Sequence, residues 1–206
     1  MDDKLLKQIS SQPCAMDHFP ATQHSKGFVR VFAYDPKTRE VVRMVDGPNL
    51  ITYSGADLMA TCLSGDATYA VKGMYFEFKN LTLPADAIVA PTYTRSGGID
   101  YYNALADPYD VIRVPLTVSP AFSSSDATKY DMNQVTFYAA TEGTAGAITS
   151  LAFNSLSNSA VFGVGLVATP DWNTQASDVV FARTYVDKVL KADNYEIGCA
   201  WVVRCT

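Results

Sequence analysis

Residues 46–80 read DGPNLITYSGADLMATCLSGDATYAVKGMYFEFKN, and this stretch predicts the exit of a β-hairpin, one short helix and a strand. Ser54, with Asp57 three residues later, supplies a hydroxyl and a carboxylate for the first free N–H groups of a helix over about 54–64. Gly65 supplies the left-handed residue that ends this helix. The apolar face expected to pack on the core comprises Leu58, Met59, Cys62 and Leu63.

Alternating apolar residues predict strands over much of the remaining chain. Residues 28–34 alternate and lead through a turn at Pro36 into 41–45, which is typical of a hairpin. Gly163 and Gly165 indicate a bulge or a close backbone approach within a strand. Further strands are expected at 71–78, 111–118, 134–139, 160–168, 179–186 and 197–205, and one helical turn at 187–192. About eight strands separated by turns favour a mainly β, β-sandwich or jelly-roll-like fold.

The domain organisation follows from where this alternation begins. Residues 1–26 are polar, contain Pro13 and Pro20, and are expected to form an irregular N-terminal arm. Residues 27–206 show no internal repeat and no linker, so we expect one β-sandwich domain. Its segment 80–110 is long, aromatic and proline-rich, and connections of this length are uncommon unless they have a role. We expect an ordered contact surface there.

Composition excludes several classes of partner. The chain of 206 residues is 48% hydrophobic and 18% charged, with a net charge of −5. Its 16 basic residues are scattered, which argues against binding to nucleic acid or anionic lipid. No stretch approaches the roughly 20 apolar residues of a membrane span. The first residues have no apolar region of the signal-peptide kind, so we expect the protein to fold in a cytoplasm.

The four cysteines are expected to be reduced thiols in such a compartment. Cys62 is expected to be a small core residue on the helix face. Cys199 and Cys205 lie roughly 20 Å apart along one strand, too far to bridge each other. No CxxC pair is present, so a structural zinc site is not expected. Cys14 and Cys205 could reach another subunit, which leaves an intersubunit disulfide as the alternative.

The residues available for catalysis are few. His18 and His24, the only histidines, both lie in the predicted arm, so catalysis that pairs serine or cysteine with histidine has no base in the domain. Asp107 and Asp110 flank a Pro-Tyr pair, which favours a turn over a pair of catalytic carboxylates. We therefore expect no enzyme activity, no cofactor and no metal.

Several stretches carry a resemblance to a known group of proteins. They are GFVRVFAYDPKTREVV with the 46–80 stretch, GGIDYYN at 97–103, VIRVPLTVSPA at 111–121, NSAVFGVGLVATPDW at 158–172 and VVFARTYV at 179–186. Their order resembles that of tailed-bacteriophage virion structural proteins, most of all capsid decoration (cement) proteins. The resemblance covers most of residues 27–206 and contains no catalytic motif.

The resemblance implies a structural virion protein, assembled in the host cytoplasm, that binds and stabilises the capsid shell through loops and the arm. Its implied partners are the major capsid protein and copies of itself in a homo-oligomer. The residues expected to make contacts are Tyr93, Tyr101, Tyr102, Tyr109 and Trp172. A tail, neck, baseplate or fibre-anchor protein is the first alternative. A carbohydrate-binding module that uses the same aromatic residues is the second.

Overall fold

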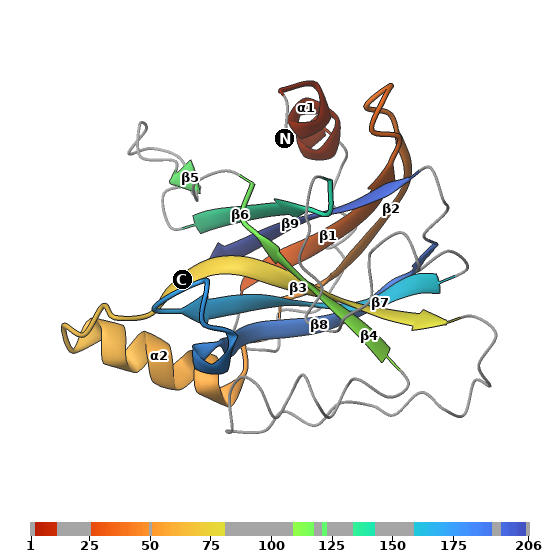
Figure 1. Cartoon of the computed structure of the whole chain (residues 1–206). Helices are drawn as coiled ribbons and strands as arrows, with labels where there is room; N and C mark the ends of the chain where they lie inside the picture. Colours follow the sequence, from red (N-terminus) through yellow and green to blue (C-terminus); the bar gives the residue numbers. More distant parts are fainter. Residues whose placement is uncertain are drawn as a thin grey trace.

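The computed structural model of the chain contains two antiparallel β-sheets that pack face to face, with one helix on an outer face and another at one end (Figure 1). The structure describes residues 3–11, 26–49, 51–80, 109–117, 121–122, 134–142, 159–190 and 195–204. Each of the eight predicted strands is present within these ranges. The predicted fold class, a β-sandwich with a short helix, is confirmed.

The first sheet has five strands in the order β2-β1-β9-β6-β5. These are β1 (Lys26–Tyr34), β2 (Val41–Pro48), β5 (Ala121–Phe122), β6 (Gln134–Ala140) and β9 (Glu196–Arg204). The predicted hairpin joins β1 to β2, and its turn is closed by Asp35, whose carboxylate accepts the N–H groups of Lys37 and Thr38. β1 and β9 are neighbours, so segments from the two ends of the chain lie side by side in the sheet centre.

The second sheet has four strands in the order β4-β3-β7-β8. These are β3 (Ala70–Asn80), β4 (Tyr109–Pro115), β7 (Ser159–Thr169) and β8 (Val179–Leu190), and a short 3₁₀ helix, η5 (Gln175–Ser177), precedes β8. The helical turn predicted at 187–192 is wrong over 187–190, because β8 continues to Leu190. Val189 is fully buried in the core, and an extended backbone is what directs it there.

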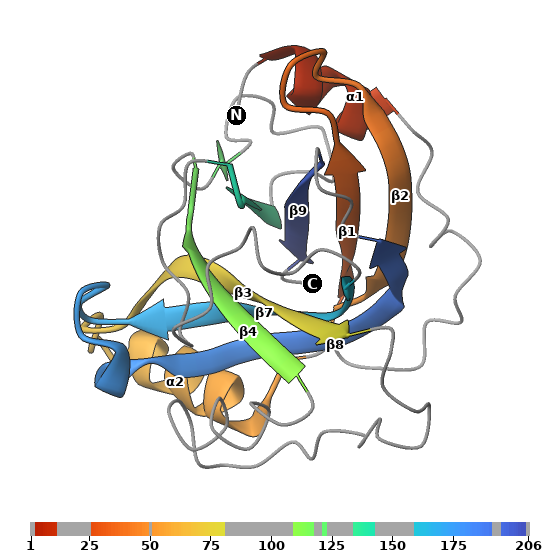
Figure 2. The ribbon, with the colours of Figure 1, turned by 45° about the vertical axis from the view of Figure 1, so that its right-hand side comes forward.

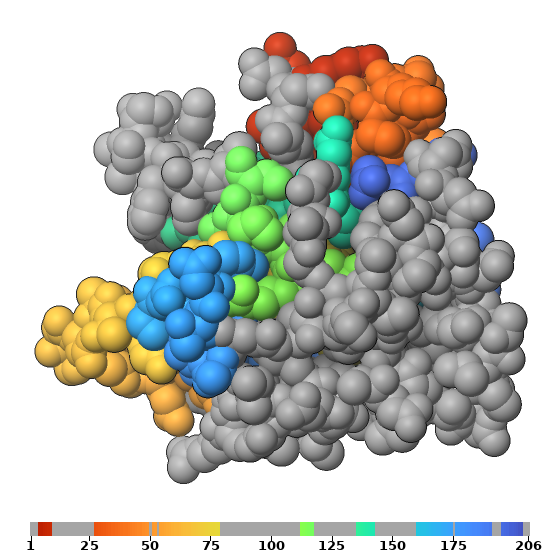
Figure 3. Space-filling view, viewed as in Figure 1, coloured from red at the N-terminus to blue at the C-terminus, as the bar shows by residue number. Residues whose placement is uncertain are grey.

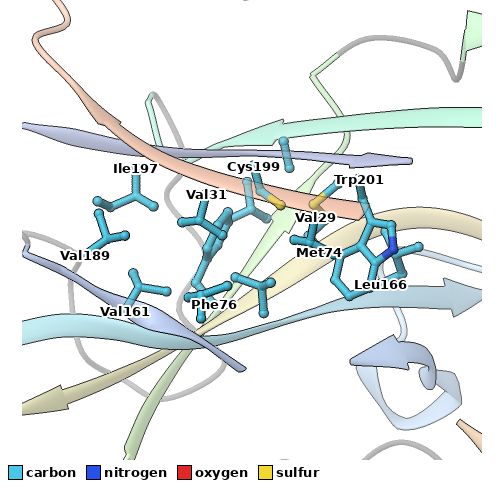
Figure 4. Packing of buried hydrophobic residues seen from close by; sticks show 14 of the residues in the cluster. Val29, Val31, Met74, Phe76, Val161, Leu166, Val189, Ile197, Cys199 and Trp201 are labelled. Atoms are coloured by element: carbon cyan, nitrogen blue, oxygen red, sulfur yellow. The ribbon is translucent and has the colours of Figure 1, made fainter. Parts of the chain in front are cut away.

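The core lies between the two sheets (Figure 4). Val29, Val31 and Trp201 of the first sheet face Met74 and Phe76 of the second, and all five are fully buried. Because side chains alternate along a strand, every second residue of the central strands reaches this layer. Each such side chain contributes about 1.5–3 kcal/mol of burial free energy, so the interior of the sandwich is its main source of stability.

The chain crosses between the sheets on both sides of the sandwich. After β2, Ile51 forms a bridge to Ala182 of β8 in the other sheet. After β4, Leu116 forms a bridge to Ala139 of β6 in the first sheet. Figure 2 shows β4 running obliquely across its own sheet. These crossings hold the edges of the two sheets together, as strands that change sheet do in other sandwiches.

Part of the segment expected to be irregular is a helix, α1 (Asp3–Ser11), on the outer face of the five-stranded sheet. Leu5 and Ile9 are buried there against Phe32 and Tyr34 of β1. The expectation is therefore wrong for residues 3–11, because one pair of apolar residues spaced i, i+4 is too short a pattern to recognise, although it suffices to dock a helix. Of the rest of the predicted arm, Lys26 begins β1, and residues 1–2 and 12–25 lie outside the described residues.

Candidate docking surface

The helix that the sequence predicts is present as α2 (Tyr53–Leu63), but its N-cap is Thr52 and not Ser54. The Thr52 hydroxyl accepts the N–H of Gly55 at 2.9 Å and donates to the carbonyl of Val180 on β8 at 2.5 Å. One side chain thus caps the helix and ties it to the sheet. Gly65, with φ of +101°, follows the helix end as predicted.

Only the first turn of α2 packs against the sandwich. Gly55 lies so close to β8 that an added Cβ would be 1.9 Å from the carbonyl oxygen of Phe181. Ser54 is buried, whereas every residue from Ala56 to Leu63 except the half-buried Leu58 is exposed. Figures 1 and 3 show α2 projecting from one end of the molecule. The helix is anchored at its start and leads away from the core.

This geometry overturns the expectation that the apolar face of the helix packs on the core. Leu63 is 88% exposed, Met59 is 37% exposed, and Cys62, expected to be a core residue, is also exposed. Tyr69, in the connection between α2 and β3, is a further exposed aromatic residue. We call Leu58, Met59, Cys62, Leu63 and Tyr69 the α2 surface. An apolar helix face without cover in the monomer is typical of an interaction site.

Acidic groups surround the α2 surface. Asp57 lies on the exposed side of the helix itself. Hydrogen bonds from the hydroxyl and N–H of Thr68 lower the pKa of Asp66. Asp171 follows Thr169, which pairs with Ala70, and it therefore lies at the same end of the sheet. The N–H of Asn173 and the hydroxyl of Thr174 lower the pKa of Asp171. The lowered pKa values keep Asp66 and Asp171 ionised, and together with Asp57 they give the apolar surface a negative rim.

Trp172, a predicted contact residue, packs beside this end of the sheet. The Arg113 Cζ lies 3.3 Å from the centroid of its ring, and the Arg113 guanidinium binds Asp178 at 2.5 and 2.8 Å. Gly73 of β3 leaves the space that the indole occupies. Burial raises the pKa of Asp178, and Arg113 opposes that rise. Trp172 is half-exposed, and its role in binding a partner stays a prediction.

A second arginine–carboxylate pair lies on the face of the four-stranded sheet that points away from the core. Arg183 of β8 binds Glu77 of β3 at 2.7 and 2.6 Å, and both side chains are buried. Gly163 of β7 lies between them, and a Cβ there would be 2.6 Å from a Glu77 carboxylate oxygen. Of the bulge or close backbone approach predicted here, the bulge is confirmed, because the pairing of β7 with β8 shifts register between Val161 and Gly163. Burial raises the pKa of Glu77, and Arg183 opposes that rise. Because Arg183 binds both oxygens of the Glu77 carboxylate, the role of this residue is structural.

Sequence reasoning did not identify these arginine–carboxylate pairs. A third one joins Arg30 of β1 to Asp46 of β2, and Arg30 also donates to the carbonyl of Ile9 in α1 at 2.6 Å. The available signal is a single charged residue inside an apolar strand, as in MYFEFKN and FVRVFAY. Such a residue needs a buried partner, but the sequence does not say which.

The other predicted site residues are only partly covered by the structure. Tyr93, Tyr101, Tyr102, Cys14 and Cys205 lie outside the described residues. The backbone of Tyr109 begins β4, opposite Lys79 of β3. The contact surface expected of these tyrosines and the alternative of an intersubunit disulfide through Cys14 and Cys205 stay predictions.

Among the residues that the structure describes, no group of three His, Cys, Asp or Glu side chains is placed to hold a metal ion. Neither described α-helix is long and apolar enough to cross a membrane. Comparison of the chain with protein-family models, curated proteins and solved structures finds no match. The geometry of the chain itself therefore carries the functional inference.

Proposed function

We propose that this protein is a structural component that acts by docking and not by catalysis, and that its assembly is the capsid shell of a tailed bacteriophage. The observation that carries the docking role is the α2 surface, an apolar helix face that projects from a rigid sandwich with Leu63 88% exposed. Isolated helices shorter than about 12–15 residues are marginal in water, so a partner that covers this helix also stabilises it. The resemblance of most of residues 27–206 to virion structural proteins supports the identity of the assembly.

The described carboxylates fit a structural role better than a catalytic one. Glu77, Asp178 and Asp46 are each bound by an arginine, and Asp66 and Asp171 accept hydrogen bonds from their own turns. A carboxylate held this way is a poor proton acceptor, because its oxygens are already engaged. A shell-binding protein needs only a rigid body and repeated surfaces, since many weak contacts add up when neighbouring copies bind together.

The experiment that tests this function is a measurement of copy number in purified virus particles. A decoration protein is expected at a copy number comparable with that of the shell subunit. A small number of copies per particle would instead favour the alternative, a tail, neck, baseplate or fibre-anchor protein. Absence from washed particles would overturn both.

Binding to empty heads gives the matching test in solution. The purified protein is expected to cosediment with empty heads and to saturate at a fixed ratio to the shell subunit. Heads already decorated with the protein provide the control, because their sites are occupied. Failure to bind undecorated heads would contradict the decoration role.

The carbohydrate-binding alternative gains no support from the described residues. A sugar platform needs an open aromatic face, and the ring of Trp172 is stacked against the Arg113 guanidinium and packed on Gly73. The tyrosines that would complete the platform lie outside the described residues, apart from the backbone of Tyr109.

A further inference from the structure

The end of the molecule that carries α2 combines apolar and negative groups. Leu63 and Met59 are its most prominent apolar side chains. Asp57, Asp66 and Asp171 are exposed around them. Two half-buried basic residues lie near this rim: Lys72 donates to the carbonyl of Pro170, and Arg113 is bound to Asp178. A partner that suits this end must offer positive charge beside apolar surface.

The opposite end of the molecule has the complementary character. Figures 1 and 2 show α1 and the β1–β2 turn together on the side away from α2. The two are joined, because Lys4 Nζ donates to the Thr38 carbonyl at 2.8 Å and the Val41 N–H donates to Gln8 at 3.2 Å. We call this the basic end, and its exposed basic residues are Lys4, Lys7, Lys37 and Arg43.

Carboxylates also lie at the basic end. The Asp35 carboxylate accepts two N–H groups of its own turn. Glu142 binds Arg39 and the Tyr34 hydroxyl, and the Arg39 hydrogen bond lowers the pKa of Glu142. Glu40 is exposed among the four basic residues. By formal charge, the five described basic side chains here (Lys4, Lys7, Lys37, Arg39 and Arg43) exceed the four carboxylates (Asp35, Glu40, Glu142 and Glu196) by one. This end is therefore slightly positive in a protein whose overall charge is −5.

Apolar surface accompanies this positive charge. Val42 lies on β2, an edge strand of the five-stranded sheet, and its side chain is 48% exposed. It precedes the exposed Arg43 in the sequence, at the point where the pairing of β2 with β1 shifts register. Apolar and basic side chains at one end are the combination that the α2 surface requires.

From this complementarity we propose that the α2 surface of one copy docks against the basic end of a second copy, so that the chains join head to tail. A symmetric pairing of two α2 surfaces would place the aspartates of both copies together, and like charges oppose such a contact. The head-to-tail contact instead places aspartates beside lysines and arginine. Each docked copy keeps one free end, so the contact closes into a ring or continues as a filament. This goes beyond the proposed function, because it states how the copies join one another.

The first experiment measures the mass of the purified full chain by sedimentation and light scattering over a concentration series. The wild type is expected to self-associate, and more weakly at high salt, which screens exposed charges. Leu63→Asp removes the apolar contact at one end, and the double variant Lys37→Glu/Arg43→Glu reverses charge at the other. Each is expected to weaken self-association at least about tenfold. A wild type that stays monomeric throughout would overturn the proposal.

Matched controls separate docking from general surface effects. Leu190→Asp changes another exposed leucine, which is 50% exposed on β8, and Lys188→Glu reverses an exposed lysine on the same strand. Both are expected to associate like the wild type. Unchanged circular dichroism and melting temperature would show that Leu63→Asp is folded, as its 88% exposure predicts. Equal loss in the control variants would count against the proposal.

Mixing the two interface variants decides the geometry. Leu63→Asp keeps an intact basic end and Lys37→Glu/Arg43→Glu keeps an intact α2 surface, so an equimolar mixture is expected to form a dimer with one native contact. A symmetric α2 pairing predicts no such rescue, and a mixture that stays monomeric would overturn the head-to-tail contact. Copy number in particles is measured independently. A protein that is abundant in particles but monomeric in solution would contradict the head-to-tail contact and would still agree with the proposed function.

Discussion

Glu77 and Arg183 show how single residues are held in this sandwich. Both side chains are at most 2% exposed, and two hydrogen bonds join them across Gly163. Burying a charge is unfavourable unless an opposite charge is buried beside it. A protein that keeps only one member of this pair is therefore expected to be less stable than one that keeps both.

We expect Glu77→Gln to lower the free energy of unfolding by about 3–5 kcal/mol, because it leaves the buried Arg183 guanidinium without a counter-charge. Urea denaturation followed by circular dichroism measures this. Glu40→Gln, on the exposed β1–β2 turn, is the matched control and is expected to change stability by less than about 0.5 kcal/mol. Equal stability of the two variants would show that the buried pair contributes little.

The two described cysteines differ in environment, and this difference can be measured. Cys62 is exposed on α2, whereas Cys199 is buried between the sheets and burial raises the pKa of its thiol. We expect iodoacetamide to modify Cys62 in the native protein and Cys199 only after denaturation. Peptide mapping by mass spectrometry reports each site separately from Cys14 and Cys205. Rapid native modification of Cys199 would contradict the packing of the core.

At the scale of elements, α2 depends on one capping residue. Thr52→Ala removes both the cap to Gly55 and the bond to Val180, so we expect a loss of about 0.5–2 kcal/mol in the free energy of unfolding. Thr61→Ala is the control in the same helix, because its hydroxyl bonds only to the Asp57 carbonyl within the helix and is exposed. Thermal unfolding compares the two, and a larger effect at Thr61 would place the anchor of α2 elsewhere.

The other helix, α1, is held by tertiary contacts. It has nine residues, too few for a stable isolated helix, and it docks through Leu5 and Ile9. We expect Leu5→Asp to release α1 and to accelerate hydrogen exchange of its amides, while the core strands β3 and β7 stay protected. Lys7→Gln on the exposed side of α1 is the control. Unchanged exchange in Leu5→Asp would show that α1 does not depend on this contact.

For the molecule as a whole, the two sheets share one core, so they are expected to unfold together. Trp201 lies inside that core, whereas Trp172 lies on the outer side of the second sheet. We expect the single-tryptophan variants Trp172→Phe and Trp201→Phe each to unfold in one step, with fluorescence and circular dichroism giving the same midpoint within each variant. Two separate midpoints in one variant would divide residues 27–206 into more than one folding unit.

Several features could be predicted because they are encoded locally. Alternation in FVRVFAY and in the run from Ile197 to Val203 identifies strands whatever they pair with, since side chains alternate along any extended chain. Gly65 ends α2 because only a few residues accept its backbone conformation. Gly163 was also informative, because a glycine inside a strand indicates that another group lies close to the backbone. Here that group is the Glu77 carboxylate.

Other features could not be predicted, because they depend on where the chain goes next. Leu58, Met59, Cys62 and Leu63 have the composition of a core-facing helix, yet the close approach of Gly55 to β8 turns the helix away from the sheet. Leu5 and Ile9 read as part of an irregular arm, yet the outer face of β1 receives them. In both cases the sequence shows which residues are apolar, but it does not show which surface they can pack against.

The amino-acid order alone was sufficient for the β-class, the strand positions, the single short helix between β2 and β3, and the acidic net charge. These depend on side-chain periodicity and on sums over residues, which need no knowledge of distant contacts. Only the tertiary structure decided which arginine binds which carboxylate and which helix is buried. It also decided that basic and apolar groups lie together at one end of the molecule. Each of these joins residues far apart in the chain, and the distances between them are set by how the two sheets pack.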